Sequence, residues 1–128
     1  MLARITSGLR VVVEMGYQDK ISDPTDHRFV FAYRITLENH NDFPVQLISR
    51  HWYIFDSIGE KSEVVGVGVV GHQPVIYPEG TYQYISGSNL RSDYGAMHGY
   101  YIFENTITGD TFQVEIPKFV LTTIPKMN

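Results

Sequence analysis

Three glycines in the middle of the sequence have the spacing of a cofactor-binding motif. Gly66, Gly68 and Gly71 match the G-x-G-x-x-G pattern of loops that bind the pyrophosphate of a dinucleotide. In such loops a helix begins at the last glycine, and its N-terminal amides hold the pyrophosphate. Here His72-Gln73-Pro74 follows directly, and Pro78 would fall inside that helix. Because a proline inside a helix costs about 3 kcal/mol, we predict no helix and no dinucleotide site.

The presence of these three glycines still needs a physical explanation. Each glycine within a strand costs about 0.5–1 kcal/mol relative to alanine. This cost is tolerated where φ must be positive, or where another group comes close to the backbone. That group is either a neighbouring strand or a ligand, for example a phosphate-bearing small molecule such as a nucleotide or pyrophosphate. Five residues are therefore candidate contacts: Gly66, Gly68, Gly71, His72 and Gln73.

Other residue types that could do chemistry form no recognisable constellation. The chain has no cysteine, and its five histidines have no ligand spacing, so a metal site would need them to converge in space with carboxylates. Ser86-Gly87-Ser88 lacks the pattern of a nucleophile elbow. Two carboxylate groupings fall in turn-rich stretches, where we predict solvated loops: Asp23 with Asp26, and Asp56 with Glu60 and Glu63. We predict no catalytic residue, no metal site, no cofactor and no enzymatic activity.

A stretch rich in glycine and serine, Ser86 to Gly99, is predicted to be a long loop. It carries Arg91, Tyr94, Met97 and His98, and arginine, tyrosine and methionine are enriched at protein interfaces. The loop is therefore a candidate partner-binding surface. Alternatively, it folds over the end of its own domain.

Strands must position these residues, because hydrophobic alternation dominates the chain. Between Arg28 and Glu38 every second residue is apolar, which predicts a long strand with one buried face. A phase shift near Ser49-Arg50 predicts a β-bulge. The other strands are predicted at Leu9 to Met15, Val45 to Ile54, Ser62 to Val70, Thr81 to Ser86, Gly99 to Glu104 and Thr111 to Ile116. No window keeps a helical period without interruption by glycine, proline or β-branched residues.

Short strands without crossover helices predict an all-β fold: an antiparallel immunoglobulin- or fibronectin-type III-like sandwich of about seven to eight strands. A closed barrel is the alternative. The length suits a single domain, residues 1–128. Only Met1 to Ser7 and Pro125 to Asn128 are expected to fray.

The composition limits the kinds of partner that the protein could bind. A net charge of −4 with scattered basic residues argues against nucleic acid as the primary partner. The absence of cysteine suits a reducing cytoplasm, and no apolar run is long enough for membrane insertion. Exposed sheet edges and nine tyrosines favour self-association as a homodimer.

Four motifs in order resemble those of the bacterial ApaG proteins, across nearly the whole chain. They are Ser49-Arg50-His51-Trp52, the stretch from Val65 to Pro74, Tyr82-Gln83-Tyr84-Ile85-Ser86-Gly87, and Gly95-Ala96-Met97-His98-Gly99-Tyr100-Tyr101. The resemblance implies a fibronectin-type sandwich. It also implies a protein-interaction role, because a similar domain occurs in eukaryotic F-box proteins and in a polymerase-delta-interacting protein. The family name is further linked to cobalt and magnesium resistance.

The chain departs from the usual pattern of this family at several positions. Members commonly carry acidic residues where Val67 and His72 stand, a Pro-Gly-Glu order where this chain has Pro78-Glu79-Gly80, and a Cys-Pro pair near Ser88-Asn89. We therefore expect a non-catalytic binding module for an unidentified protein partner. Binding of a phosphate-bearing small molecule is the alternative, and metal handling by converging histidines is a third hypothesis.

Overall fold

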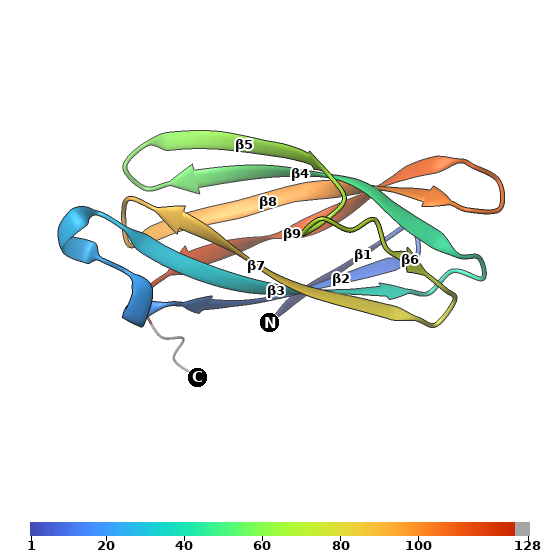
Figure 1. Ribbon diagram of the computed structural model, residues 1–128, viewed down its shortest axis with the longest axis horizontal. Coiled ribbons are helices and arrows are strands. Elements are labelled where there is room, and N and C mark those ends of the chain that lie inside the picture. The colour runs from blue at the N-terminus through green and yellow to red at the C-terminus, as the bar shows by residue number, and fades with distance from the viewer. Residues whose placement is uncertain (125–128) are drawn as a thin grey trace.

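Two antiparallel sheets lie face to face in a computed structural model that describes residues 1–124 (Figure 1). The four-stranded sheet has the order β1-β2-β3-β7, and the five-stranded sheet has the order β5-β4-β8-β9 with β6 paired to β4. The strands are β1 (Leu2–Thr6), β2 (Leu9–Tyr17), β3 (Phe29–Asn39), β4 (Val45–Asp56), β5 (Glu60–Val67), β6 (Val75–Ile76), β7 (Thr81–Leu90), β8 (Tyr94–Asn105) and β9 (Thr111–Thr122). Two 3-10 turns, η1 (Asp19–Ile21) and η2 (Pro24–Asp26), are the helical elements within residues 1–124. No helix there is long and apolar enough to cross a membrane. The predicted antiparallel sandwich is confirmed.

The core lies between the sheets and follows from the alternation of the strands. On β3, Phe31, Tyr33, Ile35 and Leu37 point inward and are buried, whereas Arg34 points outward and is exposed. Trp52 of β4, together with Tyr101 and Phe103 of β8, fills the space opposite. These large side chains bury apolar surface between the sheets and so help to hold the two sheets together.

The N-terminal residues form a strand, contrary to the prediction that Met1 to Ser7 frays. β1 pairs with β2 from Leu2↔Val13 to Thr6↔Leu9. Ser7 (φ 50°) and Gly8 (φ 77°) make the tight turn that joins the two strands, because positive φ at both central positions matches the twist of a hairpin. With β1 and the two-residue β6, the described residues form nine strands, compared with the expected seven to eight. The predicted fraying of Pro125 to Asn128 lies outside the described residues.

The predicted loop Ser86 to Gly99 is wrong. β7 continues to Leu90 and β8 begins at Tyr94, so only residues 91–93 connect these two strands. The small polar residues of β7 keep their register with β3, from Tyr33↔Ser86 to Phe29↔Leu90. Pairing with β3 therefore overrides their weak intrinsic strand propensity.

The predicted bulge is confirmed. The register between β4 and β8 shifts between Leu47 and Ser49, which leaves Ile48 outside the ladder. The Ile48 carbonyl instead accepts hydrogen bonds from the Gly68 amide (2.8 Å) and from Nε2 of Gln73 (3.0 Å). After the bulge the inward face of β4 carries Arg50 and Trp52.

The sandwich has a closed side and an open side. On the closed side β1 and β2 both pack against β9, and the Glu115 amide donates to Oγ1 of Thr6 at 3.4 Å. On the other side the sheets end in β5 and β7, which make no comparable contact with each other within the described residues (Figure 1). The functional residues must be sought first on this open side, because the interior is accessible there.

Candidate functional site

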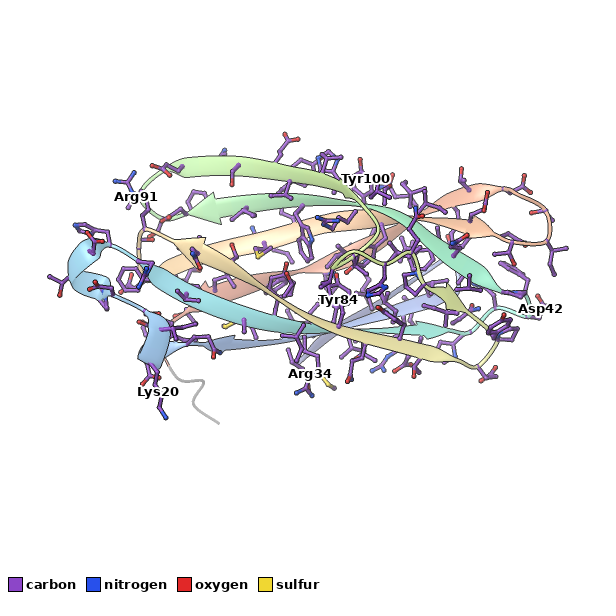
Figure 2. All side chains as sticks on the ribbon, viewed as in Figure 1. Lys20, Arg34, Asp42, Tyr84, Arg91 and Tyr100 are labelled. Carbon is purple, nitrogen blue, oxygen red and sulfur yellow. The ribbon has the colours of Figure 1, made fainter. Side chains whose placement is uncertain are left out.

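A cleft opens between the two sheets on the side of β5 and β7, and we name it the Arg50 cleft. Its volume is ≈ 240 Å³. Residues of both sheets line it, among them Tyr33, Arg50, Trp52, Val70, Tyr84 and Met97. Figure 2 shows Tyr84 on β7 between the sheets. The cleft is therefore a continuation of the core toward solvent, with polar groups added to apolar walls.

Arg50 places a positive charge in this cleft. Its side chain lies over Gly66, the residue opposite it on β5, where a Cβ would come within 2.7 Å of the guanidinium carbon. Nη1 donates to the carbonyl oxygens of Val67 (3.2 Å) and Gly68 (2.8 Å). Within residues 1–124 no carboxylate forms an ion pair with Arg50, and Nε and Nη2 have no hydrogen-bond acceptor. The guanidinium is thus anchored on one edge and free to bind an anion on the other.

Two tyrosines, Tyr33 and Tyr84, line the cleft with the arginine, and Tyr84 contacts a third, the fully buried Tyr101. The hydroxyls of Tyr84 and Tyr101 lie 2.5 Å apart. Burial raises the pKa of both phenols well above the ordinary value. Burial also raises the pKa of Tyr33, although the Ser86 hydroxyl and the charge of Arg50 offset part of this effect. At neutral pH all three phenols are therefore protonated, and the cleft contains hydrogen-bond donors and a cation but no anion of its own.

The glycine run builds one wall of the cleft. At Gly68, φ is +63° and a Cβ would lie 2.1 Å from the His72 carbonyl oxygen. Val69 and His72 exchange backbone hydrogen bonds of 2.8 and 2.9 Å around a tight turn, in which Gly71 has φ 79°. No helix follows, as predicted, because the chain continues into β6. The chain's own backbone and Arg50 are therefore the groups that approach Gly68 and Gly66, whereas Gly71 serves the turn.

The predicted contact residues lie in separate places. Gln73 and the His72 carbonyl hold the turn beside the cleft, and Met97 is buried at its base. His98 points outward from β8, where its ring stacks on Tyr53 at 5.0 Å. Arg91 and Tyr94 lie at one end of the sandwich, as Figure 2 shows for Arg91. Of the predicted contacts, Met97 lines the cleft and the glycine-run residues lie in or next to the turn beside it, whereas the others lie elsewhere.

Asp56 differs from its prediction as a solvated loop residue. It is 6% exposed and accepts hydrogen bonds from the amides of Arg91 (2.6 Å) and Ile58 (3.3 Å) and from the Ser92 hydroxyl. Burial opposes its ionisation, but these hydrogen bonds and the charge of Arg91 outweigh burial and hold the pKa below its ordinary value. Asp56 therefore stabilises the connection between β7 and β8. Asp23, in contrast, accepts from the Asp26 amide in a local turn.

Sequence reasoning missed three polar residues of the cleft, Arg50, Tyr33 and Tyr84, and the buried Tyr101 that Tyr84 contacts. A signal for Arg50 was present, because a bulge next to Ser49 puts Arg50 on the same face as Trp52. No local signal could show that Tyr84 and Tyr101 meet, because they belong to different sheets.

Comparisons with known proteins agree with this fold and with the motifs. The family model described as "ApaG domain" matches residues 19–105. Proteins called ApaG from Sinorhizobium fredii and Brucella suis are each 43% identical over 121 residues, which is 94% of this chain and 92% of each relative. The crystal structure of the putative ApaA protein from Bordetella pertussis matches with a TM-score of 0.85 and 40% identity, covering 89% of this chain and 92% of that one.

Proposed function

This chain belongs to the ApaG domain family, and from that premise we propose that it is a non-catalytic binding module whose open side receives an extended segment of a partner protein. One observation carries the proposal: Arg50 faces this side and has no carboxylate partner in the described chain. A half-buried cation of this kind is stabilised when a bound acidic group pairs with it.

The two edge strands supply the backbone contacts. Among residues 1–124, β5 pairs only with β4, and β7 only with β3, so each has one edge of backbone groups open to another strand. Addition of an extended peptide to such an edge is a common mode of recognition, with side-chain pockets providing specificity. An aspartate or glutamate of the added strand that points into the cleft would reach the free edge of the Arg50 guanidinium.

Selection from a library of random peptides tests this proposal without a known partner. We expect the wild-type protein to enrich peptides that combine an acidic residue with apolar residues at alternate positions, and Arg50→Ala to lose this enrichment. Arg34→Ala is the matched control, because Arg34 is an outward-facing arginine on β3. The far-UV spectrum of each variant checks folding. Enrichment of the same acidic peptides by folded Arg50→Ala would refute the role of the cleft.

A second candidate function is binding of a small phosphate-bearing anion in the same cleft. The free Nε and Nη2 of Arg50 favour it, because a guanidinium binds phosphate through paired hydrogen bonds. Calorimetric titration with pyrophosphate is the test, with Arg50→Ala as the comparison. Absence of heat at millimolar pyrophosphate would eliminate this function.

Metal handling has less support from the arrangement of the histidines. Within residues 1–124 no group of three or more His, Asp or Glu side chains could hold a metal ion. The expected link to cobalt or magnesium is tested by thermal melting with saturating Co²⁺ or Mg²⁺. A melting temperature raised by either ion would support the metal-handling hypothesis. The chain's lack of cysteine remains our reason for expecting a cytoplasmic location.

A further inference from the structure

The outer face of the five-stranded sheet contains a hollow that is separate from the Arg50 cleft. Its volume is ≈ 560 Å³, and its walls come from β4, β5, β8 and β9. The register explains its floor: Ala96 of β8 lies between Phe55 of β4 and Val120 of β9. Because Ala96 is smaller than both neighbours, the sheet surface is lower at this point. We name this feature the Ala96 hollow.

Planar rings line one wall of the Ala96 hollow. The rings of Tyr53 and His98 are nearly parallel, with centroids 5.0 Å apart and an interplanar angle of 21°. His51, beside the hollow, also stacks on Tyr53, with centroids 4.6 Å apart and an interplanar angle of 24°. Phe55 adds a further ring that is 37% exposed. A flat aromatic ligand can stack on such a surface with little change in the protein.

Two lysines at the rim of the hollow have no ion-pair partner among residues 1–124, whereas the nearby carboxylates are hydrogen-bonded. Lys61 and Lys118 both line the hollow, and neither forms an ion pair within the described part of the chain. The carboxylate of Glu63, which also lines it, is bound to Nε2 of His51 at 3.0 Å. Glu115 on β9 interacts electrostatically with Tyr53. Its carboxylate accepts a hydrogen bond from Nε2 of Gln113 at 2.8 Å. In a chain of net charge −4, two lysines without partners beside stacked rings favour a planar anion.

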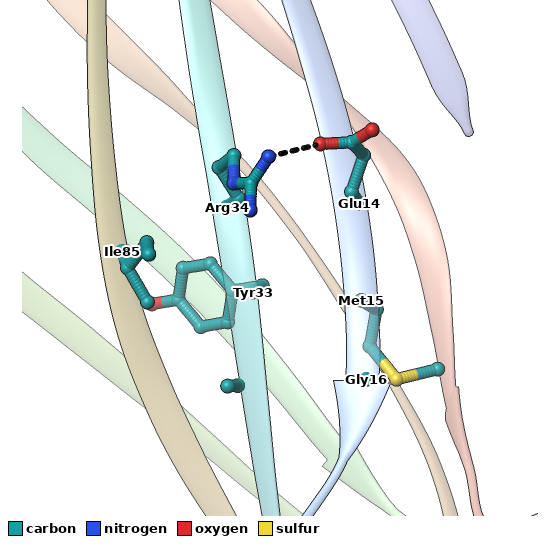
Figure 3. Close-up of a pocket in the computed structure, with 7 residues that line it drawn as sticks. Glu14, Met15, Gly16, Tyr33, Arg34 and Ile85 are labelled. Atoms are coloured by element: carbon teal, nitrogen blue, oxygen red, sulfur yellow. Dashed lines mark hydrogen bonds and ion pairs between the residues drawn. The ribbon is translucent and has the colours of Figure 1, made fainter.

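A hollow on the outer face of the opposite sheet serves as a comparison, because among the described residues it lacks the stacked rings and the unpaired cations. Figure 3 shows this second hollow over β2 and β3, and Gly16 and Ala32 are among the residues that line it. There Arg34 pairs with Glu14 at 3.5 Å, so its charges cancel. No pair of stacked rings lies among its lining residues.

From this arrangement we infer that the Ala96 hollow binds a nucleoside monophosphate. The base stacks on the rings of the hollow, and the phosphate lies between Lys61 and Lys118. A polynucleotide is a poorer fit, because binding along a strand needs a row of cations rather than two. This inference does not depend on the function proposed for the Arg50 cleft, since the two sites share no charged residue.

Three probes separate the parts of the ligand that the hollow recognises: AMP, adenosine and inorganic phosphate. In titrations followed by amide chemical shifts, we expect AMP to shift residues around Ala96, and adenosine and phosphate to bind at least about tenfold more weakly. The double variant Lys61→Ala/Lys118→Ala should weaken AMP binding by about tenfold or more. Ala96→Leu, which fills the hollow from the sheet surface, should abolish it.

Two further variants identify the site. Arg34→Ala, in the hollow of Figure 3, should bind AMP as the wild type does, and so should Arg50→Ala. Loss of AMP binding in Arg50→Ala with retention in Ala96→Leu would move the ligand to the Arg50 cleft and overturn the inference. Equal affinity for phosphate and AMP would also overturn it, because the rings would then contribute nothing.

Discussion

Val70 has a backbone conformation that a β-branched residue rarely adopts. Its φ is 47°, in the left-handed region, and together with Gly71 it forms the turn that closes the wall of the Arg50 cleft. A left-handed conformation costs about 1–2 kcal/mol for residues other than glycine, and Asn-Gly is the preferred pair for such a turn. The protein therefore keeps an apolar side chain at the cleft at a cost in stability.

Val70→Asn should raise the free energy of unfolding by about 1 kcal/mol, because asparagine tolerates the left-handed region. Urea denaturation measures the change as a higher midpoint. Val65→Asn is the control: Val65 is 67% exposed on β5, and there the loss of strand propensity should lower the midpoint. A lower midpoint for Val70→Asn would show that the turn is not strained.

Gly68 and Gly71 should respond differently to the same substitution. Gly68→Ala adds steric overlap with the His72 carbonyl to the cost of positive φ, and should destabilise the protein by about 2–5 kcal/mol. Gly71→Ala meets nothing within 4 Å and should cost only about 1–2 kcal/mol. Urea midpoints of both variants provide the comparison. Equal losses would mean that His72 can move away from residue 68.

At the scale of elements, the connection between β7 and β8 depends on an ionised carboxylate. Because the folded pKa of Asp56 is below the value of about 3.9 expected in the unfolded chain, its contribution to stability is present above about pH 4. That contribution is lost as the pH falls through the lowered pKa.

Asp56→Asn should therefore lower the free energy of unfolding at pH 7 by about 1–3 kcal/mol, with the difference from wild type shrinking below about pH 4. Denaturation curves at several pH values test this. Asp42→Asn, at the opposite end of the sandwich (Figure 2), should change stability little at any pH. A difference that stays constant from pH 7 to pH 2 would exclude the ionised form of Asp56 as the cause.

Elements were predictable from the sequence where their signal is local. The alternation of β3 identifies both its length and its buried face, because each residue reports its own side of the sheet. The second half of β7 gave no such signal, since Ser86 to Asn89 are small or polar and are held in the strand by pairing with β3. For the same reason the burial of Asp56 was not predicted. Its partners Arg91 and Ser92 lie in the connection between β7 and β8, far from Asp56 in the sequence.

The candidate site was predictable only in part. The glycines were identified by spacing, but their purpose depends on Arg50 and on the His72 carbonyl, which meet them only in the folded sheet. The Ala96 hollow was invisible for a similar reason, because Lys61 and Lys118 belong to strands separated by β4 and β8. Pattern analysis identifies the face of a strand, whereas a site requires the register between strands.

For the molecule as a whole, β5 is the edge at which self-association is expected. It presents Val64, Val65 and Val67, all exposed, beside an unpaired backbone edge. Sedimentation velocity at high micromolar concentration should therefore detect a dimer, and Val65→Lys should weaken it. Ile5→Lys, on β1 at the closed side, is the control, because Ile5 is similarly exposed (63%). A protein that sediments only as a monomer would refute this expectation.

The closed side of the sandwich also constrains the order in which the chain can fold. β1 and β9 come from opposite ends of the sequence, and the bond between Thr6 and Glu115 spans 109 positions. While a ribosome is still making β9, the first strands have no partner for this side of the core. Long-range pairing of this kind slows folding, and the nascent chain exposes its apolar residues meanwhile. Docking of β9 is therefore the step that closes this side of the sandwich.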